Sequence, residues 1–285
     1  MQLRAYYAAL KPERTYANVM TTLAGFLFAS RWHIDLALLI YTILGTTLLV
    51  MSACAANNCI DSRLDARMPS KRERATVTGV VSIRKLATVA AILGISGVLI
   101  LIVHVNLLTA LLGIIAYVDY VIFYTWSKRL TPHSTLIGTI SGAIPLIAGY
   151  TAVTNRFDLT ALLLGLVMVF WQMPHFFAIA IFRHDDYKGA GLPVWTVRYG
   201  VRNTQVWMLI YTAAYVLALV ALALFGKHGW LLLELAILSG LYWTLLGVRG
   251  FRAQKPVKWA HQMFGFSFIT LLVFSGAVAL APLLP

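Results

Sequence analysis

The sequence predicts an all-α integral membrane protein with nine membrane-spanning helices. Its 285 residues are 60% hydrophobic and only 12% charged, with a mean hydropathy of +0.79, whereas soluble domains carry roughly 25% charged residues. Apolar runs of about 17–25 residues, the length that crosses a bilayer as a helix, follow one another along the chain. Lys and Arg residues collect in alternate connections between these runs. These three observations exclude an ordinary soluble enzyme and predict the fold class.

The nine predicted spans are separated by polar connections. They cover residues 16–30, 36–56, 86–105, 107–126, 135–153, 158–182, 206–226, 230–248 and 264–283. The first span is the most polar, because Arg14 and Asn18 stand at its start. The fifth contains Gly138 and Gly142 in GxxxG spacing, which favours close helix packing. No low-complexity stretch or separate soluble segment interrupts the series, so we expect a single polytopic membrane domain over residues 1–285.

The distribution of basic residues predicts the topology. With the N-terminus in the cytoplasm, the cytoplasmic segments hold 20 of the 23 Lys and Arg residues, as the positive-inside rule requires. The C-terminus then lies outside, in a multi-pass protein of the cell (inner) membrane. The long connections 57–85, 183–205 and 249–263 are all cytoplasmic, and chemistry is expected on that side. The net charge of +13 suits anionic headgroups of the lipid bilayer, and we expect no nucleic-acid partner.

The most informative stretch is residues 57–74, where acidic and basic residues follow an apolar span directly. Asn57, Asp61 and Asp65 are four residues apart, so on a helix they lie on one face. Carboxylates at a membrane boundary are costly and usually serve an ion or a substrate. Magnesium prefers one or two carboxylates together with phosphate oxygens, which makes this face a candidate site for a magnesium-bound phosphate ester. The alternative is a solvated loop in which neighbouring acids and bases only neutralise each other.

A second acidic region, Asp185 and Asp186 followed by Tyr187, lies far along the chain in another cytoplasmic connection. Two acidic regions that face each other can hold a diphosphate between them through magnesium. Basic side chains then neutralise the remaining phosphate charge. The basic residues assigned to this task are Arg72, Arg74, Arg183 and Lys188.

Loss of a diphosphate from an allylic carbon leaves a cation that needs a cavity without water, which apolar helices can supply. Aromatic rings stabilise such a cation through their faces. The candidates are Tyr117, Tyr120, Phe123, Tyr124 and Trp171. The alternative for each of these residues is simple packing in the core or against lipid.

The stretch NNCIDSRLDARM at 57–68 resembles the first aspartate-rich motif, NxxxDxxxD, of the UbiA superfamily of intramembrane prenyltransferases. Three further stretches resemble the branch of that superfamily that farnesylates protoheme IX. They are KPERT at 11–15, YTWSKRLTPHSTLIGTISGAIPLIAGY at 124–150 and WQMPHFFAIAIFRHDDYKGAGLPV at 171–194. The resemblance covers residues from about 11 to 200, and the third stretch carries most of its specificity.

The resemblance implies a UbiA-type fold, with nine helices around a central cavity and an active site on the cytoplasmic side. It implies Mg2+ as cofactor, farnesyl diphosphate as donor and heme B as acceptor. The reaction would transfer the farnesyl group to a vinyl group of protoheme IX and give heme O. Ser70 and Lys71 depart from the superfamily pattern, which moves part of the expected phosphate contact to Lys71 or Arg72.

The residue roles follow the motif positions. The residues expected to be catalytic are Asn57, Asp61, Asp65 and Asp186, of which Asp61, Asp65 and Asp186 would contact the metal. Substrate binding is assigned to Arg72, Arg74, Lys128, Arg129, His175, Arg183, Tyr187 and Lys188. For His175 two interpretations remain open: contact with heme iron or propionates, or a hydrogen bond in the core.

Two other functions compete with this interpretation. One is a UbiA prenyltransferase with a different acceptor, such as an aromatic acid, a chlorin or a glycerol phosphate lipid. The other is a membrane transporter, which the position of the clustered aspartates disfavours because transporters keep their coupling sites near mid-membrane. Asp119 does lie within a predicted span, and such a carboxylate is either functional or hydrogen-bonded to a neighbouring helix.

Overall fold

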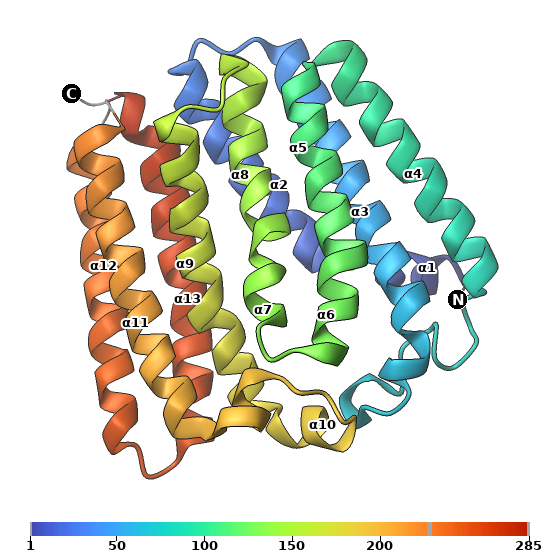
Figure 1. Cartoon of the computed structure of the whole chain (residues 1–285). Coiled ribbons are helices and arrows are strands. Elements are labelled where there is room, and N and C mark those ends of the chain that lie inside the picture. Colours follow the sequence, from blue (N-terminus) through green and yellow to red (C-terminus); the bar gives the residue numbers. More distant parts are fainter. Residues whose placement is uncertain (1, 227–229, 284–285) are drawn as a thin grey trace.

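The computed structural model describes residues 2–226 and 230–283, which form helices and connections without a strand. Long helices stand side by side, while the short α10 and the loop that follows α3 lie together at one end (Figure 1). Seven helices within the described residues are long and apolar enough to cross a membrane. They are Leu36–Asp65, Ile83–His104, Leu107–Leu130, Ser134–Thr154, Leu159–Phe182, Trp195–Phe225 and Pro256–Leu283. The chain is a multi-pass membrane protein.

The predicted number of nine spans is not confirmed. Helices do occupy the two remaining positions, α2 (Pro12–Ser30) at predicted span 16–30 and α12 (Trp230–Arg249) at predicted span 230–248. Neither belongs to the seven spans found in the described residues. In α2 the first half is polar, with Glu13 and Arg14 near its start. The prediction for α12 begins beside residues 227–229, which lie outside the described part of the chain.

The other elements agree closely with the predicted spans, and most are longer. Five spans are single helices, α3 (Leu36–Asp65), α4 (Ile83–His104), α9 (Leu159–Phe182), α11 (Trp195–Phe225) and α13 (Pro256–Leu280). The other two are composite: α5 (Leu107–Val118) continues through η2 (Asp119–Tyr124) and α6 (Thr125–Leu130), and α7 (Ser134–Ile137) precedes α8 (Thr139–Thr154). The other short elements are α1 (Gln2–Ala9), η1 (Pro69–Lys71), α10 (His184–Gly189), η3 (Gly250–Arg252) and η4 (Ala281–Leu283). The most consequential difference is α3, which continues helically through the whole acidic motif.

Close backbone contact joins α2 to α8 in the middle of the molecule. A side chain at Gly25 would meet the backbone oxygen of Leu146 at 2.1 Å, and one at Gly149 would meet that of Thr22 at 2.0 Å. The predicted packing at Gly138 and Gly142 is confirmed as well, against the side chains of Tyr124 and Gln172 respectively. Small residues thus let the helices approach closely, which favours their van der Waals packing in lipid.

A π-helical turn, η2, lies between α5 and α6. Thr125 donates its hydroxyl to the carbonyl of Tyr120 at 2.9 Å, five residues earlier. At the start of η2, Asp119 accepts a hydrogen bond from the backbone N–H of Ser141 at 3.1 Å, near the N-terminus of α8. The sequence left two interpretations of Asp119, a functional carboxylate or a hydrogen bond to a neighbouring helix. The structure shows the hydrogen bond. The π-turn adds a residue to the helix and so changes which side chains of α6 face α3.

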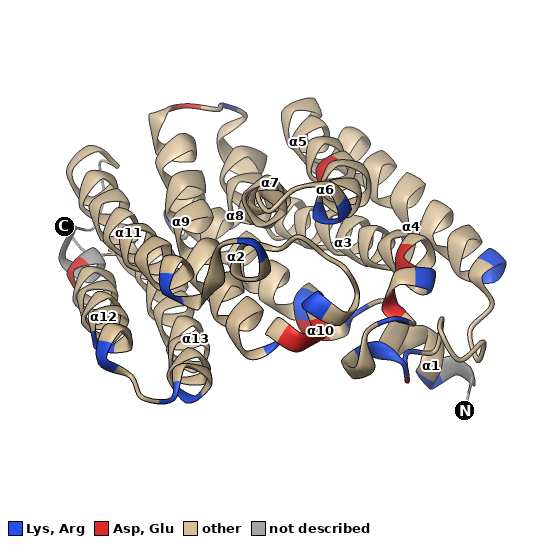
Figure 2. Cartoon of the chain, turned by 60° about the horizontal axis from the view of Figure 1, so that its bottom comes forward, with Lys and Arg blue, Asp and Glu red and all other residues tan. Residues whose placement is uncertain are grey.

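The two loops with the acidic regions pack on each other at one end of the bundle. Met68 is fully buried against Ala190, Leu192 and Val194, and Arg183 donates to the hydroxyl of Ser70 at 3.4 Å. In Figure 2, ribbon segments coloured for Lys and Arg or for Asp and Glu lie at this end, on α6, on α10 and near α1. The two acidic regions therefore share one end of the molecule, as the sequence predicts.

Candidate active site

Helix α3 presents the predicted motif as one buried face. Asn57, Asp61 and Asp65 are 4%, 3% and 0% exposed, and the amide of Asn57 donates to Asp61 Oδ2 at 2.9 Å. Their spacing of four residues aligns them along the helix. A buried carboxylate is costly unless it is paired, so the neighbours of this face determine its chemistry.

Lysine and arginine side chains from two segments, α6 and residues 71–74, surround the two carboxylates. Asp61 pairs with Lys128 and, at 3.2 Å, with Arg129, both on α6. Asp65 pairs with Lys71 at 3.1 Å and with Arg74 at 2.6 Å. The sequence analysis moved part of the expected phosphate contact to Lys71 or Arg72. Lys71 lies in the site, where it pairs with Asp65. Arg72 is exposed, and its side chain makes no hydrogen bond or ion pair with the described residues.

Lys11 adds a further cation that the sequence prediction missed. Its ammonium donates to Asn57 Oδ1 at 3.0 Å across 46 residues of sequence. The backbone of Lys11 is left-handed (φ 54°, ψ 64°), directly before Pro12 at the start of α2, a conformation that costs about 1 kcal/mol in a residue with a side chain. Burial holds the pKa of the Lys11 ammonium well below its usual range, and nearby Arg14 adds to this effect. The same cause lowers the pKa of Lys71, which Asp65 partly offsets.

The amide of Asn57 is fixed by partners on every side. One hydrogen goes to Asp61 Oδ2 and the other to Thr125 Oγ1, each at 2.9 Å. Thr125 is fully buried, and its hydroxyl donates a hydrogen bond to the carbonyl of Tyr120. The amide oxygen of Asn57 is therefore the atom that faces Lys11. The π-turn thus supplies the hydroxyl that orients the first residue of the motif.

The second acidic region is arranged differently. Asp185 is fully exposed, and its only side-chain partner among the described residues is His184, at 3.2 Å. Asp186 is partly exposed, and its side chain makes no hydrogen bond or ion pair within the described residues. The exposed Lys188 likewise has no such partner there. Burial raises the pKa of Tyr187 to about 12, with Tyr124 adding to the effect and Arg183 and Arg14 opposing it. Tyr187 and Arg183 therefore reach the site, while the two aspartates lie at its rim.

Arg14 lies between the acidic face and an aromatic group deeper in the bundle. Its guanidinium donates to the hydroxyl of Tyr120 at 2.7 Å, and the Tyr120 ring stacks on that of Tyr124 at a centroid distance of 5.4 Å. Arg14 also acts electrostatically on Tyr187 and on His175. Arg14 belongs to the KPERT stretch at residues 11–15, but the sequence alone assigns it no role.

His175 sits on α9 among aromatic rings. It stacks on Trp171 with a centroid distance of 5.0 Å, and its Nδ1 lies 2.7 Å from the hydroxyl of Ser267 on α13. That hydroxyl donates its proton to the carbonyl of Phe264, so it accepts from His175 and Nδ1 carries the ring proton. Nε2 is then the nitrogen with a lone pair, the form of histidine that binds metals.

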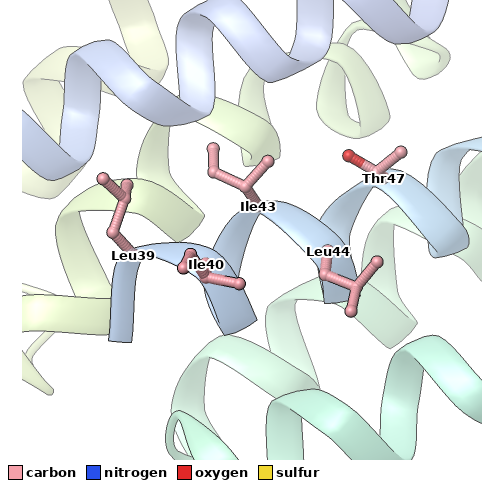
Figure 3. A pocket seen from close by; sticks show the side chains of 5 residues that line it. All are labelled: Leu39, Ile40, Ile43, Leu44 and Thr47. Carbon is pink, nitrogen blue, oxygen red and sulfur yellow. The ribbon is translucent and has the colours of Figure 1, made fainter. Parts of the chain in front are cut away.

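A pocket elsewhere on α3 does not belong to this site. It measures about 410 Å³ and is formed by Leu39, Ile40, Ile43, Leu44 and Thr47 (Figure 3). A second, of about 580 Å³, lies beside Asp119 and Trp126. Both are bordered mainly by apolar side chains, several of them exposed, as expected of hollows that face lipid.

The acidic face offers the oxygen atoms that magnesium prefers. Asp65 Oδ1 is buried and receives no hydrogen bond from the described residues, and its contact with Lys71 is an ion pair. With Asp61 and the Asn57 amide it forms a set of oxygen donors on one face. Within the described chain no group of three or more His, Cys, Asp or Glu side chains comes together as a metal site, and the contact of Asp186 with the metal stays a prediction. Two carboxylates nevertheless suffice when phosphate oxygens and water supply the other ligands.

Three comparisons relate this fold and site to known proteins. The profile described as the UbiA prenyltransferase family matches residues 18–272. The protein named protoheme IX farnesyltransferase 2 of Pseudomonas entomophila (strain L48) is 40% identical over 96% of this chain and 94% of its own length. The protein of the same name from Pseudomonas fluorescens (strain Pf0-1) is 38% identical over 98% of this chain and 95% of its own.

Among solved structures, a UbiA homolog from Archaeoglobus fulgidus bound to GPP and Mg2+ shares the fold. The two superpose with a TM-score of 0.74 at 14% sequence identity, over 96% of this chain and 99% of the other. The family profile covers most of the chain, the relatives align along nearly all of it, and the helical arrangement is the same. This chain belongs to the UbiA prenyltransferase family.

Proposed function

We propose that this protein transfers the farnesyl group of farnesyl diphosphate to a vinyl group of heme B, giving heme O, with Mg2+ as cofactor. The observation that carries the reaction type is the buried α3 face, where four basic side chains pair with two carboxylates and a fifth, Lys11, contacts Asn57. Such a site suits a metal-bound diphosphate. The acceptor rests on the relatives named protoheme IX farnesyltransferase, which align with nearly the whole chain.

On the donor side, the α3 face and the basic side chains act together. Asn57, Asp61 and Asp65 would hold magnesium, which lowers the charge of the diphosphate leaving group. Lys128 and Arg129 already lie at Asp61, where they stabilise negative charge as the carbon–oxygen bond breaks and its electron pair stays with the diphosphate. Arg183 directly precedes α10, and Asp186 and Lys188 lie on it, at the same end of the bundle. These three residues would bind the diphosphate from that side, and Arg72 provides an exposed positive charge nearby.

The remaining allylic cation must react before water reaches it. Tyr120 and Tyr124 stack beside Arg14, and their ring faces stabilise positive carbon. The vinyl double bond of the acceptor then attacks the cation and forms the new carbon–carbon bond. Addition of water to the resulting cation, with loss of a proton, completes a hydroxyethylfarnesyl group.

On the acceptor side, His175 would bind the heme through Nε2. The hydrogen bond from Nδ1 to Ser267 fixes this tautomer and orients the ring, as the partners of metal-binding histidines commonly do. The finer topology is also part of the proposal: a single domain over residues 1–285 in the cell membrane, with the N-terminus cytoplasmic and the C-terminus outside. The acidic end then faces the cytoplasm, where soluble diphosphates are available.

The test is expression of the chain in a host that lacks heme O, followed by chromatography of the extracted hemes. We expect a new, more apolar heme of the mass of heme O, which disappears when His175 is changed to Ala. The matched control His261→Ala alters another histidine, on α13, whose ring contacts Phe182, and should keep the product. Magnesium-dependent prenyl transfer to another acceptor, without heme O, would favour the alternative enzyme. Absence of any prenyl transfer from purified protein would favour the transporter.

A further inference from the structure

Each residue of the α3 motif is contacted by one lysine ammonium, and each lysine comes from a different segment. Lys11, before α2, contacts Asn57 at 3.0 Å. Lys128, on α6, contacts Asp61. Lys71, in η1, contacts Asp65 at 3.1 Å. The oxygens that the lysines contact are Asn57 Oδ1, Asp61 Oδ2 and Asp65 Oδ1.

Arginines take the carboxylate oxygens that the lysines leave. Arg129 lies 3.2 Å from Asp61 Oδ1 and Arg74 lies 2.6 Å from Asp65 Oδ2. Every carboxylate oxygen of the motif therefore has a basic side chain beside it. A magnesium ion that binds this face must take oxygens from these side chains, and it would enter a cluster with five basic groups and two carboxylates, a formal excess of three positive charges (5 − 2).

A diphosphate changes both the net charge of this cluster and the number of oxygens available to its basic side chains. It brings negative charge that offsets the excess, and it brings oxygens to which the displaced ammonium groups can move. Lysine suits such an exchange, because its ammonium is a compact charge on a flexible stem, whereas the guanidinium is a rigid, planar group. The arginines can thus hold the carboxylates in place while the lysines change partner.

We propose that Lys11, Lys71 and Lys128 make metal binding conditional on the diphosphate. Each lysine gives up a motif oxygen to the metal and moves to a phosphate oxygen, so the two ligands bind cooperatively and magnesium alone binds weakly. This inference rests on the proposed function, since it takes a prenyl diphosphate as the partner of the metal. The coupling is reciprocal: the metal strengthens diphosphate binding by the same factor.

The experiment measures Mn2+ binding to the full-length protein in nanodiscs by electron paramagnetic resonance, with and without farnesyl thiodiphosphate as an unreactive donor. Mn2+ stands in for Mg2+, and no heme is added. For the native protein we expect the thiodiphosphate to raise Mn2+ affinity about tenfold or more, within the usual range of coupling between sites. Mn2+ should raise thiodiphosphate affinity by an equal factor.

Lys71→Met and Lys11→Met separate an exchanging lysine from a simple phosphate ligand. Both variants should bind thiodiphosphate more weakly and bind Mn2+ alone more tightly than the native protein, so the coupling factor falls. Lys85→Met, at an exposed lysine at the start of α4, is the control and should leave both affinities unchanged. Lys71→Arg keeps the charge and the ion pair, and it should leave Mn2+ binding alone weak.

Different outcomes overturn different claims. Independent binding of the two ligands by the native protein refutes the exchange, whatever the variants do, and so does an unchanged or weaker Mn2+ affinity in a folded Lys→Met variant. Failure of the native protein to bind thiodiphosphate even with Mn2+ present refutes the proposed function instead. Size-exclusion elution in detergent identifies a variant that has not folded, and the second lysine then gives the answer.

Discussion

The two acidic regions contain the same residue type in opposite surroundings. Asp61 and Asp65 are buried, and each of their carboxylate oxygens lies within 3.2 Å of a lysine or arginine nitrogen. Asp185 is fully exposed, and the side chain of Asp186 makes no hydrogen bond or ion pair within the described residues. The first region is held rigidly on a long helix, whereas the second lies on the six-residue α10. The difference indicates a division between a preorganised site and a rim that engages the substrate.

Burial explains why only the first region is surrounded by partners. A buried carboxylate without a partner is strongly destabilising, so the fold brings basic side chains to α3 from segments on both sides of it. On α10, the exposed Asp185 and the partly exposed Asp186 keep contact with water and do not require a basic partner. Catalysis gains most from groups that are already in position before the charge develops, which predicts a graded series of effects when the two regions are altered.

The largest effect is expected from Asp61→Asn. This change keeps the shape of the side chain but removes the charge that pairs with Lys128 and Arg129 and would hold the metal. We expect farnesyl transfer to fall by about 100-fold or more, as for loss of a preorganised electrostatic group. The measurement is kcat/KM for heme O formation at saturating Mg2+, with helical content from circular dichroism to show that the protein is folded. Native-like turnover in this variant would contradict the assigned role of the α3 face.

A smaller effect is expected from Asp186→Asn. Because this carboxylate is partly exposed, its loss should mainly weaken the complex with the donor, by roughly tenfold as for one charge-assisted hydrogen bond. KM for farnesyl diphosphate should rise while kcat changes little, and higher Mg2+ should recover part of the loss. Equal donor affinity in variant and native protein would remove Asp186 from the site. A loss as large as that of Asp61→Asn would abolish the distinction between the two regions.

The sequence predicted much of the first region because its signal is local. The spacing of Asn57, Asp61 and Asp65 is a helical repeat, and it follows an apolar run that is visible without any structure. Positive residues in alternate connections likewise placed both acidic regions at one end, and the packing of Met68 on Leu192 confirms that their loops meet. The sequence therefore predicted features that depend on residues close together in the chain, and features that follow from the positive-inside rule.

The partners of the motif could not be predicted, since nothing local connects them to it. Lys11 reaches Asn57 across 46 residues through a left-handed backbone that no hydropathy pattern indicates. Thr125 faces α3 because of a π-turn, and apolar periodicity does not reveal one added residue in a helix. The predicted count of spans is not confirmed where polar residues dilute the apolar signal, as in α2.

A third prediction tests whether the hydrogen bond from Asn57 to Thr125 matters for the first region. Thr125→Val keeps the shape of the side chain but leaves the Asn57 amide and the Tyr120 carbonyl without their shared partner. We expect a loss of about 1–3 kcal/mol in the free energy of unfolding, the cost of leaving a buried polar group unsatisfied, together with weaker donor binding. Thr125→Ser keeps the hydroxyl and should recover most of both. Urea titration in detergent and KM for the donor are the measurements, and a Val variant equal to the native protein would show that the hydroxyl is dispensable.

The smallest effect is expected from Asp185→Asn, and it decides how the second region works. Asp185 is fully exposed beside His184, and surface substitutions of this kind change energies by less than about 0.5 kcal/mol, so kcat/KM should stay within roughly twofold of the native value. Asp186→Asn, one residue away, is the matched comparison, because both changes remove one charge from the same short helix. If Asp185→Asn lowers donor affinity as much as Asp186→Asn does, the two aspartates act through the net charge of the rim. If only Asp186→Asn has an effect, a specific carboxylate engages the substrate, and the second region is a site in its own right.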